Sequence, residues 1–95
     1  MNRERALLDQ QIKGCTILIQ KKQKQKNLGR VFDTRGVAYF RKGQFQLAIA
    51  DYDRAIALGY TAALYHRSLA KEKLGDHAGA GADLGAYKQS QNGGR

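Results

Sequence analysis

Apolar residues recur along most of the chain at spacings of three and four, which is the period of an amphipathic α-helix. The pattern is clearest in residues 44–58, where one face carries Phe45, Ala48, Ile49, Tyr52, Ala55 and Ile56. Residues 5–20 show the same period, through Leu8, Ile12, Cys15 and Ile19. These stripes predict helices that bury one face in a shared core, with Cys15 as a small core residue.

Glycines separate the apolar segments from one another. Gly43, Gly59 and Gly75 each follow a periodic segment, at the position where a helix commonly ends on a glycine. Thr61 and Asp76 are suited to cap the helices that follow them. The sequence therefore predicts five helices, over residues 4–20, 28–42, 44–58, 61–74 and 77–90.

The last of these helices is the weakest. Gly79, Gly81 and Gly85 lie inside it, and each costs about 1 kcal/mol relative to alanine. We expect this helix to open first and residues 91–95 to form a disordered tail. The chain has no proline, so nothing apart from its glycines forces a helix to break.

The predicted helices repeat in the sequence. Gly43 matches Gly75, Ala48 matches Ala80 and Asp51 matches Asp83, so one frame recurs at a constant spacing. A single helical hairpin cannot bury its apolar face alone, and such a repeat therefore implies successive hairpins stacked on a continuous core. We expect one all-α domain over residues 1–95, built as antiparallel helix-turn-helix hairpins.

Residues 28–60 resemble a known family. The resemblance is carried by Phe32, Gly36, Ala38, Tyr39, Gly43, Phe45, Ala48, Ile49, Tyr52, Ala55, Ile56 and Leu58. Together they resemble a nearly complete tetratricopeptide repeat, with Gly36 small where two helices touch. Residues 61–90 resemble a degenerate copy, and residues 6–20 the second half of a preceding one. The resemblance implies a short α-solenoid of about two and a half repeats. Within the family, the sequence is similar to bacterial members.

The resemblance also implies a function, because the first helices of such hairpins line a concave groove that binds proteins or peptides. The corresponding residues are Asp33, Thr34, Val37, Phe40, Arg41, Tyr65, His66, Leu69, Glu72 and Lys73. Phe40 and Tyr65 are expected as exposed aromatic anchors. We therefore expect a protein-interaction adaptor or scaffold whose partner is an unidentified protein or peptide. A third interpretation is a repeat fragment that self-associates through its terminal helices.

Charge supports a second function. The formal net charge is +9, and residues 1–30 hold eight basic residues against two acidic ones. A basic edge follows the first helix, within and just after a connector at residues 21–27 that has no apolar residue, and consists of Lys21, Lys22, Lys24, Lys26 and Arg30. Such an edge attracts anionic partners, so a nucleic-acid-associated module is the alternative. No aromatic residue lies in the lysine run to stack on bases, which makes nucleic acid the less favoured partner.

Residues with catalytic or metal-binding chemistry are scattered. His66 and His77 have no second histidine or cysteine at ligand spacing, so we expect a groove residue and a helix-start packing residue, and no metal or cofactor. Asp51 and Asp83 are expected as ordinary surface charges beside Arg54 and Lys88. No catalytic residue is predicted, and the chain is expected not to be an enzyme. The absence of a long apolar run predicts a soluble chain without a membrane span, in which a cytoplasmic location is favoured and a mature exported protein stays open.

Overall fold

The computed structural model describes residues 3–21 and 25–92. In this part of the chain it contains five helices and no strand: α1 (Arg3–Gln20), α2 (Gln25–Arg41), α3 (Phe45–Ala57), α4 (Ala62–Lys73) and α5 (His77–Asn92). The predicted all-α class and the five predicted helices are confirmed. The helices differ from the predicted bounds by at most three residues at either end.

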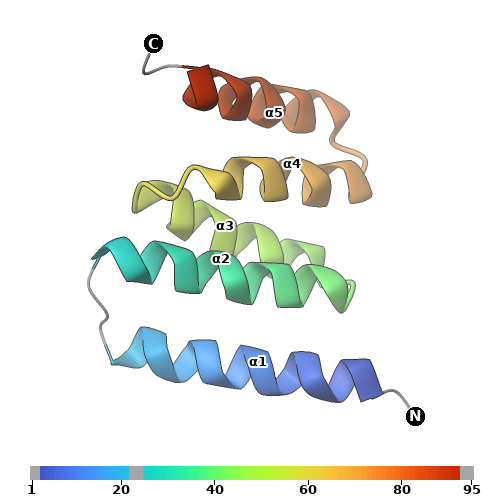
Figure 1. Cartoon of the computed structure of the whole chain (residues 1–95). Helices are drawn as coiled ribbons and strands as arrows, with labels where there is room; N and C mark the ends of the chain where they lie inside the picture. Colours follow the sequence, from blue (N-terminus) through green and yellow to red (C-terminus); the bar gives the residue numbers. More distant parts are fainter. Residues whose placement is uncertain (1–2, 22–24, 93–95) are drawn as a thin grey trace.

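The helices follow one another in a stack, with the N-terminus at one end and the C-terminus at the other (Figure 1). Each helix packs on the next in the chain, and α2 also contacts α4. The pairs α2 with α3 and α4 with α5 form antiparallel hairpins, and α1 lies against α2 outside them. The result is a thin slab of 43 × 33 × 17 Å. This is the hairpin stack that the repeated frame predicts.

Glycines end three of the helices, as predicted. Gly43, Gly59 and Gly75 have φ angles of 80°, 89° and 85°, in the left-handed region that side chains disfavour. The residue after each glycine donates its backbone N–H to a carbonyl five residues earlier; for example, Gln44 donates to Tyr39 over 2.9 Å. This bond satisfies a carbonyl that the helix end would otherwise leave unpaired.

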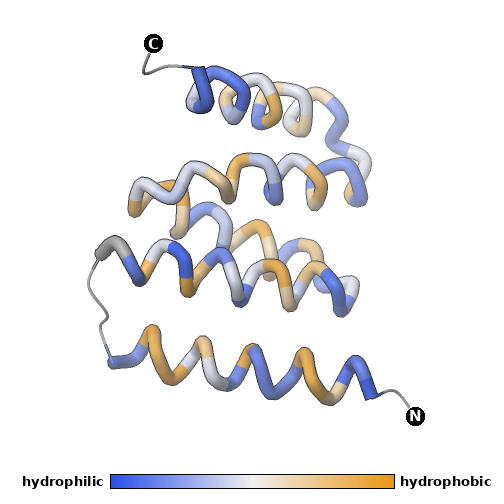
Figure 2. The backbone as a smooth tube through the Cα atoms, in the orientation of Figure 1, coloured by the Kyte–Doolittle hydropathy of each residue, from blue (hydrophilic) through white to orange (hydrophobic). Residues whose placement is uncertain are grey.

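The core lies between α2, α3 and α4, and Tyr52 is its largest fully buried side chain. Its other buried members are Phe32, Ala48, Ala55, Ala63 and Ala70. The alternation of apolar and polar positions that produces this core is visible along each helix in Figure 2. Gly36 lies directly against the ring of Tyr52, where a Cβ atom would come within 2.6 Å of Cε1. A small residue is therefore required at Gly36, as the resemblance implies.

Two residues of the predicted core differ in their burial. Cys15 is buried in α1, which confirms the prediction, and burial raises the pKa of its thiol. Phe45 was expected to be fully in the core but is only half-buried. It lies in the first turn of α3, at the edge of the hairpin, where fewer neighbours surround it.

The ends of some elements also differ from prediction. α2 begins at Gln25 because lysine and glutamine favour helix even where no apolar face exists to bury. Thr61 makes no side-chain capping bond, whereas the backbone N–H of Gly79 donates to Oδ1 of Asp76 over 2.9 Å. α5 continues through Asn92 into the predicted tail, and residues 93–95 lie outside the described part.

Candidate protein-binding groove

The predicted groove residues lie on α2 and α4, which contact each other in the stack. Arg41, Tyr65, Leu69, Glu72 and Lys73 are exposed, while Thr34, Val37, Phe40 and His66 are half-buried and Asp33 is buried. Tyr65 and Leu69 lie one turn apart on α4 and are 41% and 39% exposed. The exposed apolar side chains among the predicted groove residues are therefore on α4.

Asp33 was expected to face a partner, and the structure corrects this. Its carboxylate is 5% exposed and accepts a hydrogen bond from Nδ1 of His66 over 2.8 Å, so that it links α2 to α4. The His66 ring also lies 5.7 Å from the ring of Tyr52. A carboxylate this deep in the protein must be paired, and its partner is inside the chain. Asp33 thus positions His66 instead of lining the groove.

Phe40 was expected as an exposed aromatic anchor but is half-buried. Its ring meets the ring of Phe45 edge-on, with centroids 5.2 Å apart and planes at 69°. Tyr65, the other expected anchor, is exposed as predicted, and its ring lies 5.9 Å from His66 and 5.6 Å from Tyr87. The neighbouring rings restrict the motion of the Tyr65 ring, so this side chain would lose less entropy if a partner covered it.

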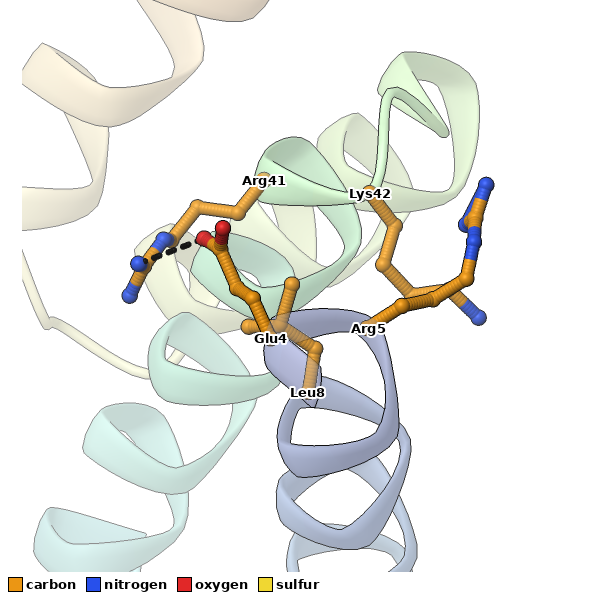
Figure 3. A pocket seen from close by; sticks show the side chains of 5 residues that line it. All are labelled: Glu4, Arg5, Leu8, Arg41 and Lys42. Carbon is orange, nitrogen blue, oxygen red and sulfur yellow. Dashed lines mark hydrogen bonds and ion pairs between the residues drawn. The ribbon is translucent and has the colours of Figure 1, made fainter. Parts of the chain in front are cut away.

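Arg41 lies at the end of α2, where it faces α1. Its guanidinium donates to Oε2 of Glu4 over 2.8 Å, and both side chains are more than half exposed. Lys42, directly after α2, forms an ion pair with Asp9 on α1. Arg41, Lys42, Glu4 and Leu8 line a small hollow (Figure 3). Its volume is about 110 Å³. Exposed pairs of this kind stabilise a fold little, so Arg41 remains accessible to a partner.

Asp51 is not a surface charge beside Arg54, as was expected. It is 4% exposed, and its two carboxylate oxygens accept bonds from Nε and Nη2 of Arg35, each 2.8 Å long. The same guanidinium donates through Nη1 to Thr16 on α1 over 3.0 Å. The hydrogen bond to Asp51 raises the pKa of Arg35. Arg54 instead lies over the ring of Phe32, 5.0 Å from its centroid.

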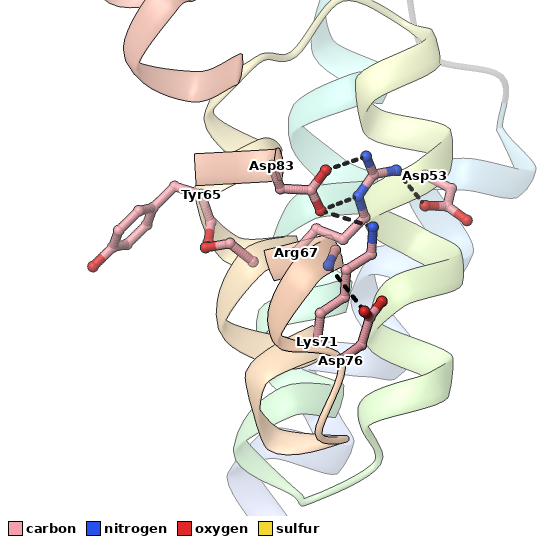
Figure 4. Close-up of polar contacts among 8 residues, drawn as sticks. Asp53, Tyr65, Arg67, Lys71, Asp76 and Asp83 are labelled. Atoms are coloured by element: carbon pink, nitrogen blue, oxygen red, sulfur yellow. Dashed lines mark hydrogen bonds and ion pairs between the residues drawn. The ribbon is translucent and has the colours of Figure 1, made fainter. Parts of the chain in front are cut away.

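Asp83 repeats this arrangement in the second hairpin (Figure 4). Its carboxylate is 5% exposed and accepts bonds of 2.8 and 2.7 Å from Arg67, whose Nη1 also donates to Asp53 on α3. Lys71 adds a third contact at 3.0 Å. Burial alone would raise the pKa of Asp83, but the bonds from Arg67 and Lys71 outweigh it and hold the pKa below its ordinary value.

The two arginines make equivalent contacts. Each binds an aspartate 16 residues later within its own hairpin and also a residue of the preceding helix, Thr16 or Asp53. We call each set an arginine clamp: the first consists of Arg35, Asp51 and Thr16, and the second of Arg67, Asp83 and Asp53. The recurrence of arginine in the same repeated frame as the aspartates was the signal in the sequence that could have found them.

The basic edge is only partly within the described residues. Lys21 and Arg30 are exposed, whereas Lys22, Lys24 and the side chain of Lys26 lie outside the described part. His77, expected to pack at the start of α5, is exposed and pairs with Glu72 over 2.7 Å. Among the described residues, no group of three histidine, cysteine or acidic side chains could hold a metal ion, and no helix is long and apolar enough to cross a membrane.

Comparison with known proteins gives one match. Residues 29–60 match the family model of the tetratricopeptide repeat. No curated protein and no solved structure matches the chain. The matched residues cover most of α2, all of α3 and the turn into α4, and they include the contact between Gly36 and Tyr52. The match and the five-helix stack around it show that the chain contains a tetratricopeptide repeat, at residues 29–60.

Proposed function

We propose that the chain is a protein-interaction adaptor that binds a protein or peptide in the groove over α2 and α4. Tetratricopeptide repeats generally mediate contacts between proteins and generally act as non-enzymatic scaffolds. The observation that carries the proposal is the exposed pair Tyr65 and Leu69 on α4, a helix that contacts α2 with its half-buried Val37 and Phe40. An aromatic and a leucine that leave water together are typical anchors of an interface.

The division of the chain supports the same function. We propose that residues 28–60 form the complete repeat, that residues 61–90 form a degenerate repeat, and that residues 6–20 supply a half repeat. In this arrangement α2 and α4 are the first helices of their hairpins, and both present side chains to the groove. The arginine clamps hold the hairpins in register, so that the groove is rigid before a partner arrives.

The test begins with capture of partners by the full chain at low and at physiological salt, followed by affinity measurements with the captured partner. Tyr65→Ala and Leu69→Ala should each weaken binding by more than about 1 kcal/mol, because they remove the exposed anchors. Leu47→Ala is the matched control, since Leu47 is 49% exposed but lies on α3. Phe40→Ala is a poorer test because it also disturbs the packing against Phe45.

The charge of +9 favours a second candidate, a nucleic-acid-associated module. In that case the logarithm of affinity should fall with the logarithm of salt, with a slope of about 0.7 to 0.9 for each phosphate contacted. Changing Lys21, Lys22, Lys24 and Lys26 together to glutamine would then abolish binding, while Tyr65→Ala would not. That ranking would reject the groove and support the basic edge; the opposite ranking supports the groove.

A further inference from the structure

α1 occupies the same place beside α2 that α3 occupies beside α4. Arg35 on α2 donates to Thr16 on α1, and Arg67 on α4 donates to Asp53 on α3. Since Arg35 and Arg67 make the same contacts, Thr16 corresponds to Asp53. Gln11 then corresponds to Ala48, and Leu18 to Ala55. α1 is therefore the second helix of a hairpin whose first helix is absent from the described part.

The absence leaves one face of α1 uncovered. In α3, the matching residues Ala48 and Ala55 are completely buried, because the hairpin partner α2 covers them. α1 packs only on α2 within the described residues, and Leu7 and Leu18 remain 58% and 40% exposed. Leu7, Gln11, Gly14 and Leu18 follow one another at spacings of four, three and four, so they lie on one face of the helix. We call these four residues the open face of α1.

The surface beside the open face is shaped to receive a helix. A Cβ atom at Gly14 would have no atom within 4 Å, so a neighbouring helix can approach closely there. A hollow of about 310 Å³ lies at one end of the face, with Leu7, Gln11 and Arg41 in its wall. Thr34 on α2 holds the position that His66 holds on α4, and His66 is the residue that reaches back to the preceding first helix. A helix on the open face would lie beside Thr34 in the same way.

Charge decides what kind of helix fits. Arg3 lies one turn before Leu7, and Lys21 lies one turn after Leu18, so basic side chains flank both ends of the open face. Glu4 also lies in the wall of the hollow at the end of the face, but its charge is paired with that of Arg41. A second copy of α1 would bring the same basic residues against Arg3 and Lys21, and like charges repel. A helix with acidic residues beside its apolar stripe would instead be attracted.

We propose that the open face of α1 binds an amphipathic helix with acidic flanks from a partner protein, which completes the hairpin. This site lies on α1 and does not depend on Tyr65 and Leu69, so it is separate from the groove on α4. Residues 7–18 span about 17 Å of helix, so a partner segment of about 15 residues covers them. Burial of Leu7 and Leu18 provides affinity, and Arg3 and Lys21 select the sign of the partner's charge.

The test uses three synthetic peptides of about 15 residues: an amphipathic helix with a leucine stripe flanked by glutamates, the same helix with lysines in place of the glutamates, and a scrambled acidic sequence. Binding to the full chain is measured by fluorescence anisotropy. The acidic amphipathic peptide should bind at least about tenfold more tightly than either control, a difference of about 1.4 kcal/mol. No saturation by this peptide at concentrations up to about 1 mM overturns the proposal.

Variants of the chain locate the binding. Leu7→Gln with Leu18→Gln should lower the affinity at least about tenfold, and the exposure of both side chains means that the fold should be retained. Leu47→Gln and Tyr65→Ala are matched controls that should leave it unchanged. Arg3→Gln with Lys21→Gln should remove the preference for the acidic peptide. Unchanged binding by the leucine variant, or a wild-type dimer that the leucine variant converts to a monomer, would show that the proposal is wrong.

Discussion

Two arginines decide how the helices are held together at the scale of single residues. Arg35 and Arg67 each neutralise an aspartate that is at most 5% exposed. Each also donates a hydrogen bond to the helix that precedes its own hairpin, α1 for Arg35 and α3 for Arg67. A buried carboxylate is tolerated only when it is paired and fully hydrogen-bonded. The sequence showed that Asp51 and Asp83 recur, but reasoning along one helix assigned Arg54 and Lys88 as neighbours. The true partners lie on a different helix, where helical spacing gives no information.

Asp83→Asn tests the second arginine clamp through its dependence on pH. The variant leaves Arg67 and Lys71 without their shared anion and should lower the free energy of unfolding by about 2 kcal/mol at pH 7. Because the pKa of Asp83 is held below its ordinary value of 3.8, the wild-type chain has this stabilisation above about pH 4 and loses it as the pH falls through the lowered pKa. Urea unfolding at several pH values should show the two proteins converging in acid.

The control for this experiment is Asp53→Asn, which removes the exposed partner of the same arginine. Asp53 is 53% exposed, so its loss should change stability by less than about 1 kcal/mol. A difference between wild type and Asp83→Asn that stays constant from neutral to acidic pH would contradict the assignment, because it would not come from ionisation of the carboxylate.

At the scale of helices, the sequence predicted most of what the structure shows. The helix ends at Gly43, Gly59 and Gly75 could be predicted because left-handed backbone strongly favours glycine, and this preference is local. The exposure of the groove side chains could not. Asp33 and Phe40 are covered by residues of other helices, His66 and Phe45, and a single helix pattern does not contain those contacts.

α5 offers a direct test of helix propensity. Gly81 and Gly85 are exposed helical positions with no atom within 4 Å of an added Cβ, so Gly81→Ala and Gly85→Ala should each stabilise the helix by about 0.5 to 1 kcal/mol. Gly79→Ala is the matched control, because its Cβ would lie 2.2 Å from Oδ2 of Asp76 and disturb the cap. Urea unfolding followed by circular dichroism measures all three. Equal stabilisation by the three substitutions would mean that the cap at Asp76 contributes nothing.

At the scale of the whole molecule, the stack should open from its ends. Among the described helices, α5 packs on α4 alone, whereas α3 lies between α2 and α4 and carries the fully buried Tyr52. In such arrays each element is stabilised mainly by its nearest neighbours. Amide hydrogen exchange should therefore be fast in residues 80–88 and slow in residues 48–56. If both segments were equally protected, an additional contact would have to cover α5, and a concentration series would show whether a second copy provides it.

The arginine clamps also bear on how a chain of this kind changes length over evolution. Each clamp spans 16 residues within a hairpin and reaches one helix back, so the second clamp is a displaced copy of the first. Loss of residues 35–66 would join Thr34 to Arg67, so that Arg67 takes the place of Arg35. Arg67 would then face Thr16, and Asp83 would still follow it by 16 residues. Duplication of the same segment would add a hairpin with its own clamp. Whole repeats can thus be gained or lost in a single genetic event without leaving the aspartate of an arginine clamp unpaired.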